Sequence, residues 1–120
     1  MPLDRQWQVL TEFCEQQSPC ILVPNYDYLT SAIGPGLSNR VGILGIIHSD
    51  DIEHYDHANR LGRYWNYFVC SSRYLADNLK EIIPYFSSEK VRVIPYGVPG
   101  PRRATVEFSR PTEPLRIVYC

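Results

Sequence analysis

The sequence lacks a strong excess of either charge. Its 12 lysines and arginines stand against 13 aspartates and glutamates, for a net charge of −1. A nucleic-acid or anionic-membrane partner usually requires a basic excess or a basic face, and none is visible here. No apolar run reaches the roughly 18 residues of a membrane helix, and the opening MPLDRQWQ has no signal-peptide pattern. We therefore expect a cytoplasmic protein with no nucleic-acid partner and no transmembrane segment.

Several common site motifs are also missing. The chain has no G-x-G-x-x-G, no P-loop and no G-x-S-x-G elbow, so neither a phosphate-binding loop of these types nor a serine nucleophile is indicated. Gly42 and Gly45 match no phosphate motif and are expected to allow close helix packing. The cysteines form no C-x-x-C pair and no metal-finger spacing, and we expect them to be reduced and structural: Cys14, Cys20, Cys70 and Cys120.

What the sequence does have is alternating helix and strand patterns. Apolar residues recur at helical spacing near the amino end, and short apolar runs bounded by proline, glycine and asparagine follow. The pattern predicts helices over 4–17, about 51–62 and between Ser72 and Pro84, a short helix over 28–33, and strands over 20–23, 41–47, 67–70 and 91–94.

The predicted buried faces follow from the same pattern. Residues 20–23 are a nearly continuous apolar run, typical of a strand covered on both faces. Residues 41–47, VGILGII, contain no charge and are expected mid-sheet. Ser49 or Asp50 is expected to cap the next helix. The inward faces of the two later helices are predicted to consist of Ile52, Tyr55 and Ala58, and of Leu75, Leu79 and Ile82.

Strand–helix alternation of this kind predicts an α/β fold. The expected architecture is a partial Rossmann-like, doubly wound parallel sheet with right-handed crossovers. The strand order is left open, because the alternation fixes the class and not the order. In such sheets ligands bind beyond the carboxyl ends of the strands, where polar loops gather.

Each predicted strand is followed by polar residues at its carboxyl end. If the strands are parallel, these segments share one edge of the sheet and form a candidate site. Taken singly, Ser49 and Ser72 are better explained as helix caps and Asn25 as a turn former, and it is the convergence of all four segments that favours a site. The four segments are Asn25-Tyr26-Asp27, His48-Ser49-Asp50-Asp51, Ser71-Ser72-Arg73 and Tyr96-Gly97.

The segment HSDDIEHYDH contains every histidine of the chain. His54 and His57 are three residues apart on a predicted helix and could share a metal ion, with Asp50 as a further ligand. A solvated helix face gives the same composition and is the favoured interpretation. His48 differs, because it directly follows a buried strand and precedes a helix, a place that suits an imidazole donating to a hydroxyl or phosphate.

Four segments in order now carry a resemblance to a known family: VGILGIIHSDD with a following R-x-G-R-Y-W, YFVCSSRYLADNL, EKVRVIPYGVP and PLRIVYC. This order resembles the family 4 glycosyltransferases of the GT-B fold, over about residues 19–120. The resemblance implies that residues 1–98 are part of the N-terminal acceptor domain, 99–114 the linker, and 115–120 the first strand of the donor domain.

The resemblance also assigns roles by position. It places His48 near the reacting sugar as the catalytic candidate, with Asp50 in the family's H-x-D string and Ser72 and Arg73 near the cleft. At Tyr96 the family commonly has asparagine, so no direct polar role is expected there. Together with the strand-end argument, the expected acceptor-binding residues are Asn25, Tyr26, Asp27, Ser49, Asp50, Ser72, Arg73 and Gly97.

The implied reaction is transfer of a glycosyl group from a nucleotide-sugar to a hydroxyl acceptor, with no metal and no cofactor. Helix N-termini and basic side chains would meet the charge of the leaving diphosphate. Because the donor domain would lie beyond residue 120, this chain alone is not expected to catalyse transfer. It is expected to self-associate through an exposed sheet edge. The alternatives are a free-standing α/β binding or regulatory module and a metal-dependent hydrolase.

Overall fold

The computed structural model describes residues 1–97 of the chain. The predicted linker 99–114 and the strand 115–120, with Cys120, lie outside the described residues. Three short 3-10 turns, at Gly34–Gly36, Gly62–Tyr64 and Ser88–Lys90, join the regular elements. These elements are α1 (Leu3–Gln16), β1 (Cys20–Leu22), α2 (Tyr28–Ser31), β2 (Val41–Ile47), α3 (Ile52–Leu61), β3 (Tyr67–Cys70), α4 (Arg73–Ile82) and β4 (Val91–Val93).

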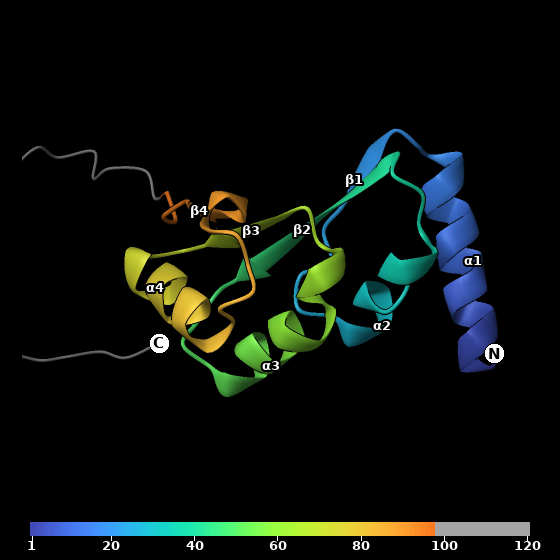
Figure 1. Cartoon of the computed structure of the whole chain (residues 1–120). Coiled ribbons are helices and arrows are strands. Elements are labelled where there is room, and N and C mark those ends of the chain that lie inside the picture. Colours follow the sequence, from blue (N-terminus) through green and yellow to red (C-terminus); the bar gives the residue numbers. More distant parts are fainter. Residues whose placement is uncertain (98–120) are drawn as a thin grey trace, which may run out of the picture.

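The four strands form one parallel sheet in the order β1-β2-β3-β4 (Figure 1). The α/β class and the Rossmann-like, all-parallel sheet are therefore confirmed. So is the expectation that residues 41–47 lie mid-sheet, since β2 pairs with β1 on one side and with β3 on the other. The edge strands of the described sheet are β1 and β4, each three residues long. Short edges limit pairing with a second sheet, and self-association through them stays a prediction.

The helices α2, α3 and α4 lie on one side of the sheet (Figure 1). This follows from the strand order: right-handed crossovers between strands that are neighbours in sequence and in space place every connecting helix on the same face. Burial alternates along β2 accordingly, with Val41, Ile43 and Ile47 on the buried face. The prediction that residues 20–23 are covered on both faces was wrong, because Ile21 is 71% exposed.

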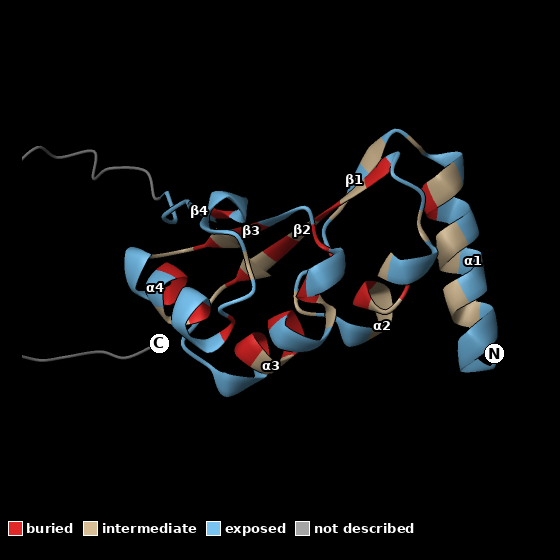
Figure 2. Ribbon diagram, viewed as in Figure 1, coloured by how far each residue is buried: buried red, intermediate tan, exposed pale blue. Residues whose placement is uncertain are grey.

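The core lies between β2, β3 and the helices α3 and α4, where buried positions concentrate (Figure 2). Its centre is an aromatic pair, Trp65 and Phe68, with ring centroids 5.1 Å apart. Gly45 makes room for it, since a Cβ there would lie 1.9 Å from Cε3 of Trp65. Gly45 does allow a close approach, as predicted. The group that approaches is the indole of Trp65, from the segment before β3, and not a helix. At Gly42 a Cβ would meet only ordinary contacts.

Two helix faces differ from their predictions. On α3 the buried residues include His54, Tyr55 and His57, while Ile52 is 75% exposed because it begins the helix beyond the edge of the core. On α4 the predicted Leu75 and Leu79 are buried, but Ile82 is half-exposed. Its place is taken by Ile83, where the backbone leaves helical geometry (φ −125°, ψ 73°) and turns the side chain inward.

Helix α1 packs against the β1 side of the sheet through a smaller cluster. Cys14 is buried there with Ile33 and Val41. Cys14, Cys20 and Cys70 are free thiols, as expected, and burial raises the pKa of Cys14 and that of Cys70, the latter to about 11. Thiols with raised pKa values react slowly as nucleophiles, which supports a structural role for Cys14 and Cys70. Within residues 1–97 no helix is both long and apolar enough to cross a membrane.

Candidate functional site

The strand ends meet around the side chain of His48, which follows β2. Its Nε2 lies 2.6 Å from the Oδ1 of Asn25, which follows β1, and its Nδ1 is hydrogen-bonded to the hydroxyl of Tyr96, which follows β4. From the end of β3, Ser71 donates its hydroxyl to the backbone oxygen of His48 over 3.1 Å. All four strands therefore contribute one residue to a single hydrogen-bonded group at the carboxyl edge of the sheet.

The two partners of His48 favour one tautomer of its neutral ring. The amide oxygen of Asn25 can only accept, so in the neutral imidazole Nε2 carries the hydrogen and Nδ1 accepts from the O–H of Tyr96. The rings of His48 and Tyr96 are nearly parallel, at an interplanar angle of 6°. A ligand hydroxyl that replaced Asn25 could accept from Nε2 of His48, and one that replaced Tyr96 could donate to Nδ1. The polar contact of Tyr96 was missed from the sequence, where no polar role was expected for it.

The turn after β1 is strained at a bulky residue. Asn25 has φ 45° and Tyr26 φ 75°, a region that asparagine tolerates and tyrosine rarely enters. Tyr26 is held there by two contacts with α3: its hydroxyl bonds Glu53, and its ring lies on that of His54 with centroids 4.2 Å apart. The bond to Glu53, and then burial, raise the pKa of Tyr26 to about 12. The strained turn thus presents the amide of Asn25 to His48.

His54 and His57 are buried, so the favoured interpretation of a solvated helix face was wrong for both. His54 lies between His48 and Tyr26, and the Nε2 of His57 lies 2.7 Å from the hydroxyl oxygen of Ser31. Burial lowers both pKa values. The next contribution comes from His48 for the pKa of His54, and from His54 for that of His57. Two neutral imidazoles therefore underlie the site at neutral pH.

The alternative of a metal ion at His54 and His57 finds no support among residues 1–97. That part of the chain contains no group of three or more histidine, cysteine or acidic side chains placed to hold a metal. The third ligand considered, Asp50, is directed to α4 instead.

Asp50 joins α3 to α4. Its carboxylate accepts from the hydroxyl of Tyr55 at 2.8 Å, the hydroxyl of Tyr74 at 3.1 Å and the side-chain amide of Asn78 at 3.3 Å. These bonds, with Tyr55 first, lower the pKa of Asp50. The oxygens of this predicted acceptor-binding residue are occupied by protein donors, and it fixes the position of the loop that carries His48.

Two further predicted residues cap helices. Asp27 accepts from the backbone N–H of Leu29 and Thr30 at the start of α2, and Ser72 accepts from that of Leu75 at the start of α4. The cap of α3 is Asp51, which accepts from the N–H of Glu53. The prediction of Ser49 or Asp50 as this cap was therefore wrong by one or two positions. An aspartate at position 50 or 51 could cap the helix equally well. Asp51 takes this role because the carboxylate of Asp50 accepts from three other side chains.

The remaining predicted residues are exposed at the same edge. Ser49 and Arg73 make no side-chain hydrogen bond or ion pair within the described part of the chain, and a Cβ on Gly97 would meet nothing within 4 Å. Arg73 opens α4, a helix with no acidic residue in its first turn, whereas α3 has Glu53 there. Of the N-termini of α3 and α4, that of α4 is therefore the better suited to an anion.

No protein-family model, no curated protein sequence and no solved structure matches this chain.

Proposed function

We propose that this chain forms the acceptor-binding wall of a glycosyltransferase with the GT-B architecture, similar to family 4. The observation that carries the proposal is His48, held at the carboxyl edge of a parallel sheet between the side chains of Asn25 and Tyr96. In open α/β sheets this edge is where ligands bind. An oriented imidazole with amide and hydroxyl neighbours suits a sugar, whose hydroxyls both donate and accept.

In the proposed reaction a hydroxyl-bearing acceptor lies on His48, and a nucleotide-sugar is supplied from a second domain. The ring of His48 binds and orients a hydroxyl of this acceptor, which takes the place of the hydrogen bond to Asn25 or to Tyr96. Arg73 and the first turn of α4 face the leaving diphosphate, whose growing charge a basic side chain and helix N–H groups stabilise. The proposed chemistry uses no metal and no cofactor.

The test uses the longest translated product that contains this chain, assayed for sugar transfer from nucleotide-sugars. We expect His48→Ala to lower the rate of transfer by about tenfold or more, because it removes one oriented hydrogen bond to the acceptor. The matched control is Tyr85→Phe, which removes a hydroxyl that bonds Asn59 away from this edge and should leave activity unchanged. The 120-residue chain by itself should show no transfer. Equal activity of the His48 and Tyr85 variants would refute the proposed site.

The second candidate is a free-standing binding or regulatory module, and one observation favours it. Residues 1–97 alone bring together all four strand ends, and Tyr96 closes over His48 without any contribution from another domain. Such a module would bind a sugar or sugar phosphate with this chain alone. Movement of the His48 ring signals in an NMR titration with monosaccharides, combined with no transfer by any longer product, would favour the module over the transferase.

A further inference from the structure

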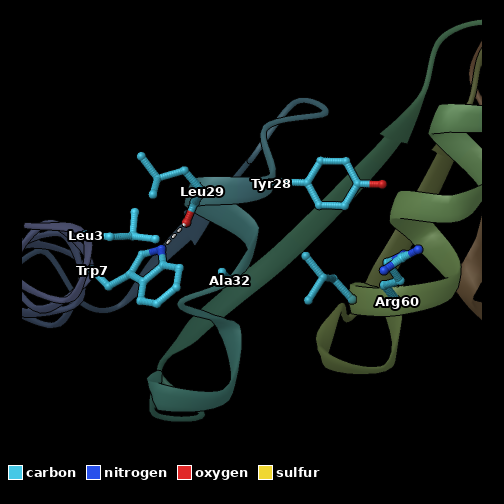
Figure 3. Close-up of a pocket in the computed structure, with 7 residues that line it drawn as sticks. Leu3, Trp7, Tyr28, Leu29, Ala32 and Arg60 are labelled. Carbon is cyan, nitrogen blue, oxygen red and sulfur yellow. Dashed lines mark hydrogen bonds between the residues drawn. The ribbon is translucent and has the colours of Figure 1, made fainter.

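A cavity of about 420 Å³ opens between α1, α2 and α3, in the helical layer (Figure 3). In Figure 3, Leu3 and Trp7 lie on one side of it and Tyr28 and Arg60 on the other, with Ala32 between them. None of its residues belongs to the hydrogen-bonded group around His48. The lining residues are Leu3, Trp7, Tyr28, Leu29, Ala32, Arg60 and Leu61.

The walls of this cavity are apolar and already in place. The indole N–H of Trp7 donates to the backbone oxygen of Leu29 over 3.1 Å, which satisfies the only polar group of that side chain and fixes its ring. Leucine and alanine side chains complete the wall. Binding sites for small molecules have this character: a mostly apolar concavity of about 300–1,000 Å³ with a few placed polar groups.

The placed polar group is the guanidinium of Arg60. Its Nε donates to the Oδ2 of Asp56 over 2.7 Å, and the hydroxyl of Tyr28 donates to the same oxygen over 3.0 Å. Within residues 1–97 the Nη1 and Nη2 of Arg60 donate no hydrogen bond, and no acidic residue lines the cavity. Asp56 thus forms an ion pair with one side of this exposed guanidinium and leaves Nη1 and Nη2, its two outer nitrogens, without a hydrogen-bond partner among the described residues. A guanidinium presented in this way matches a carboxylate, with two parallel N–H donors.

We propose that this cavity binds a small amphiphile, with an aliphatic or aromatic body that ends in one carboxylate. The body lies against Trp7 and Leu61, and the carboxylate accepts from the outer nitrogens of Arg60. Burial of the body supplies the affinity, and the guanidinium selects the anionic end. This site is independent of the proposed transferase site, because the two share no residue.

The experiment compares three probes with the same chain and different ends: octanoate, octanol and octyltrimethylammonium. Binding is followed by NMR through the indole N–H signals of the two tryptophans. Trp7 lines the cavity, whereas Trp65 is buried in the core and serves as the internal control. Trp7→Phe assigns the first signal. We expect octanoate to shift the Trp7 signal saturably, to leave that of Trp65 in place, and to bind about tenfold or more tightly than octanol.

The charge is tested with a matched pair of arginines near the end of α3. Arg60→Gln should abolish the preference for octanoate over octanol, and Arg63→Gln, which removes the same charge without lining this cavity, should preserve it. Both positions are exposed, so both variants should fold. Equal affinities for octanoate and octanol, tighter binding of octyltrimethylammonium on the aromatic walls, or equal effects of the two substitutions would each overturn the proposal. So would a titration in which the Trp7 signal does not move.

Discussion

The ring of Tyr26 lies on the imidazole of His54, with centroids 4.2 Å apart and planes 32° apart, although the backbone of Tyr26 has φ 75°. A positive φ is unfavourable for a bulky side chain, so a contact made by that side chain must hold the conformation. This ring contact, together with the bond from the Tyr26 hydroxyl to Glu53, ties the turn after β1 to helix α3. The position of Asn25, and through it the orientation of His48, depends on these two contacts of Tyr26.

The side chain and the backbone of Tyr26 can be separated by substitution. Tyr26→Phe keeps the ring on His54 and loses only the exposed bond to Glu53, so it should lower the free energy of unfolding by less than about 1 kcal/mol. Tyr26→Ala loses the ring but keeps the strained backbone, and should destabilise by about 1 kcal/mol or more. Tyr26→Gly loses the ring and relieves the strain, so it should be about 1 kcal/mol more stable than the alanine variant. Urea unfolding gives the order, and an alanine variant as stable as glycine would show that the turn is not strained.

The buried histidines should make stability fall on mild acidification. Their pKa values are lowered below the ordinary 6.5 in the folded chain, so below that pH the unfolded chain takes up protons that the folded chain resists. The free energy of unfolding should therefore be nearly constant between about pH 7 and 8 and decline as the pH falls from the ordinary pKa of histidine toward the lowered ones. The carboxylates with lowered pKa values, Glu15, Asp27, Asp50 and Asp56, add to the loss only at lower pH, as it falls through their ordinary values of 4.5 for Glu15 and 3.8 for the aspartates.

His57 provides the check on this decline. His57→Gln keeps a polar side chain near Ser31 but cannot take up a proton, so its stability should depend less steeply on pH between about 7 and 5. Urea unfolding across this range measures the two slopes. A variant with the slope of the unsubstituted chain would mean that His57 does not contribute to the acid sensitivity.

Alanine substitutions at two glycines of β2 should affect stability differently. Gly45→Ala would place a Cβ 1.9 Å from the indole of Trp65 and should destabilise by about 2–3 kcal/mol through overpacking. Gly42→Ala, three residues earlier on β2, meets its nearest atom at 3.8 Å and should stay within about 0.5 kcal/mol of the unsubstituted chain. Thermal unfolding of both variants decides the matter. Similar stabilities would mean that Trp65 can move out of the space above Gly45.

Two serines at neighbouring strand ends give a similar contrast. Ser72 accepts from the N–H of Leu75 at the start of α4, whereas Ser49 makes no side-chain hydrogen bond within residues 1–97. Ser72→Ala should cost about 1 kcal/mol of stability, the usual value of a helix cap, and Ser49→Ala less than about 0.5 kcal/mol. A chemical denaturation curve for each variant measures both values. If both substitutions lowered the free energy of unfolding equally, the capping bond of Ser72 would not explain its contribution.

Much of the fold could be predicted from the sequence, because individual helices and strands leave local patterns in it. The charge-free run at 41–47 marks the central strand, and Ser72 followed by Leu75 and Leu79 marks a capped amphipathic helix. What the pattern misses depends on tertiary geometry. The exposed side of Ile21 results from the strand order, which places the helices on one face, and the inward turn of Ile83 results from the backbone leaving α4.

For the candidate site, the sequence could predict the edge of the sheet where it lies, but not the contacts between its side chains. Parallel strands bring Asn25, His48 and Tyr96 together, and the sequence places all three at strand ends but predicts no polar role for Tyr96. The bond between His48 and Tyr96 crosses 48 residues of chain and has no local signal. The role of Asp50 was equally out of reach, because two of its three donors, Tyr74 and Asn78, come from a different helix.

The link between Tyr96 and His48 is also the one that sets the chemistry of the site. With the hydroxyl of Tyr96 donating to Nδ1, the hydrogen of the imidazole lies on Nε2, toward Asn25. Tyr96→Phe removes this donor and should allow the other tautomer, with the hydrogen on Nδ1, to become populated. The ring nitrogen chemical shifts of His48 at neutral pH report the ratio directly. Tyr85→Phe, whose hydroxyl bonds Asn59 instead, is the control and should leave that ratio unchanged. If the nitrogen shifts are the same in both variants, Tyr96 does not determine the tautomer, and His48 must be oriented by Asn25 alone.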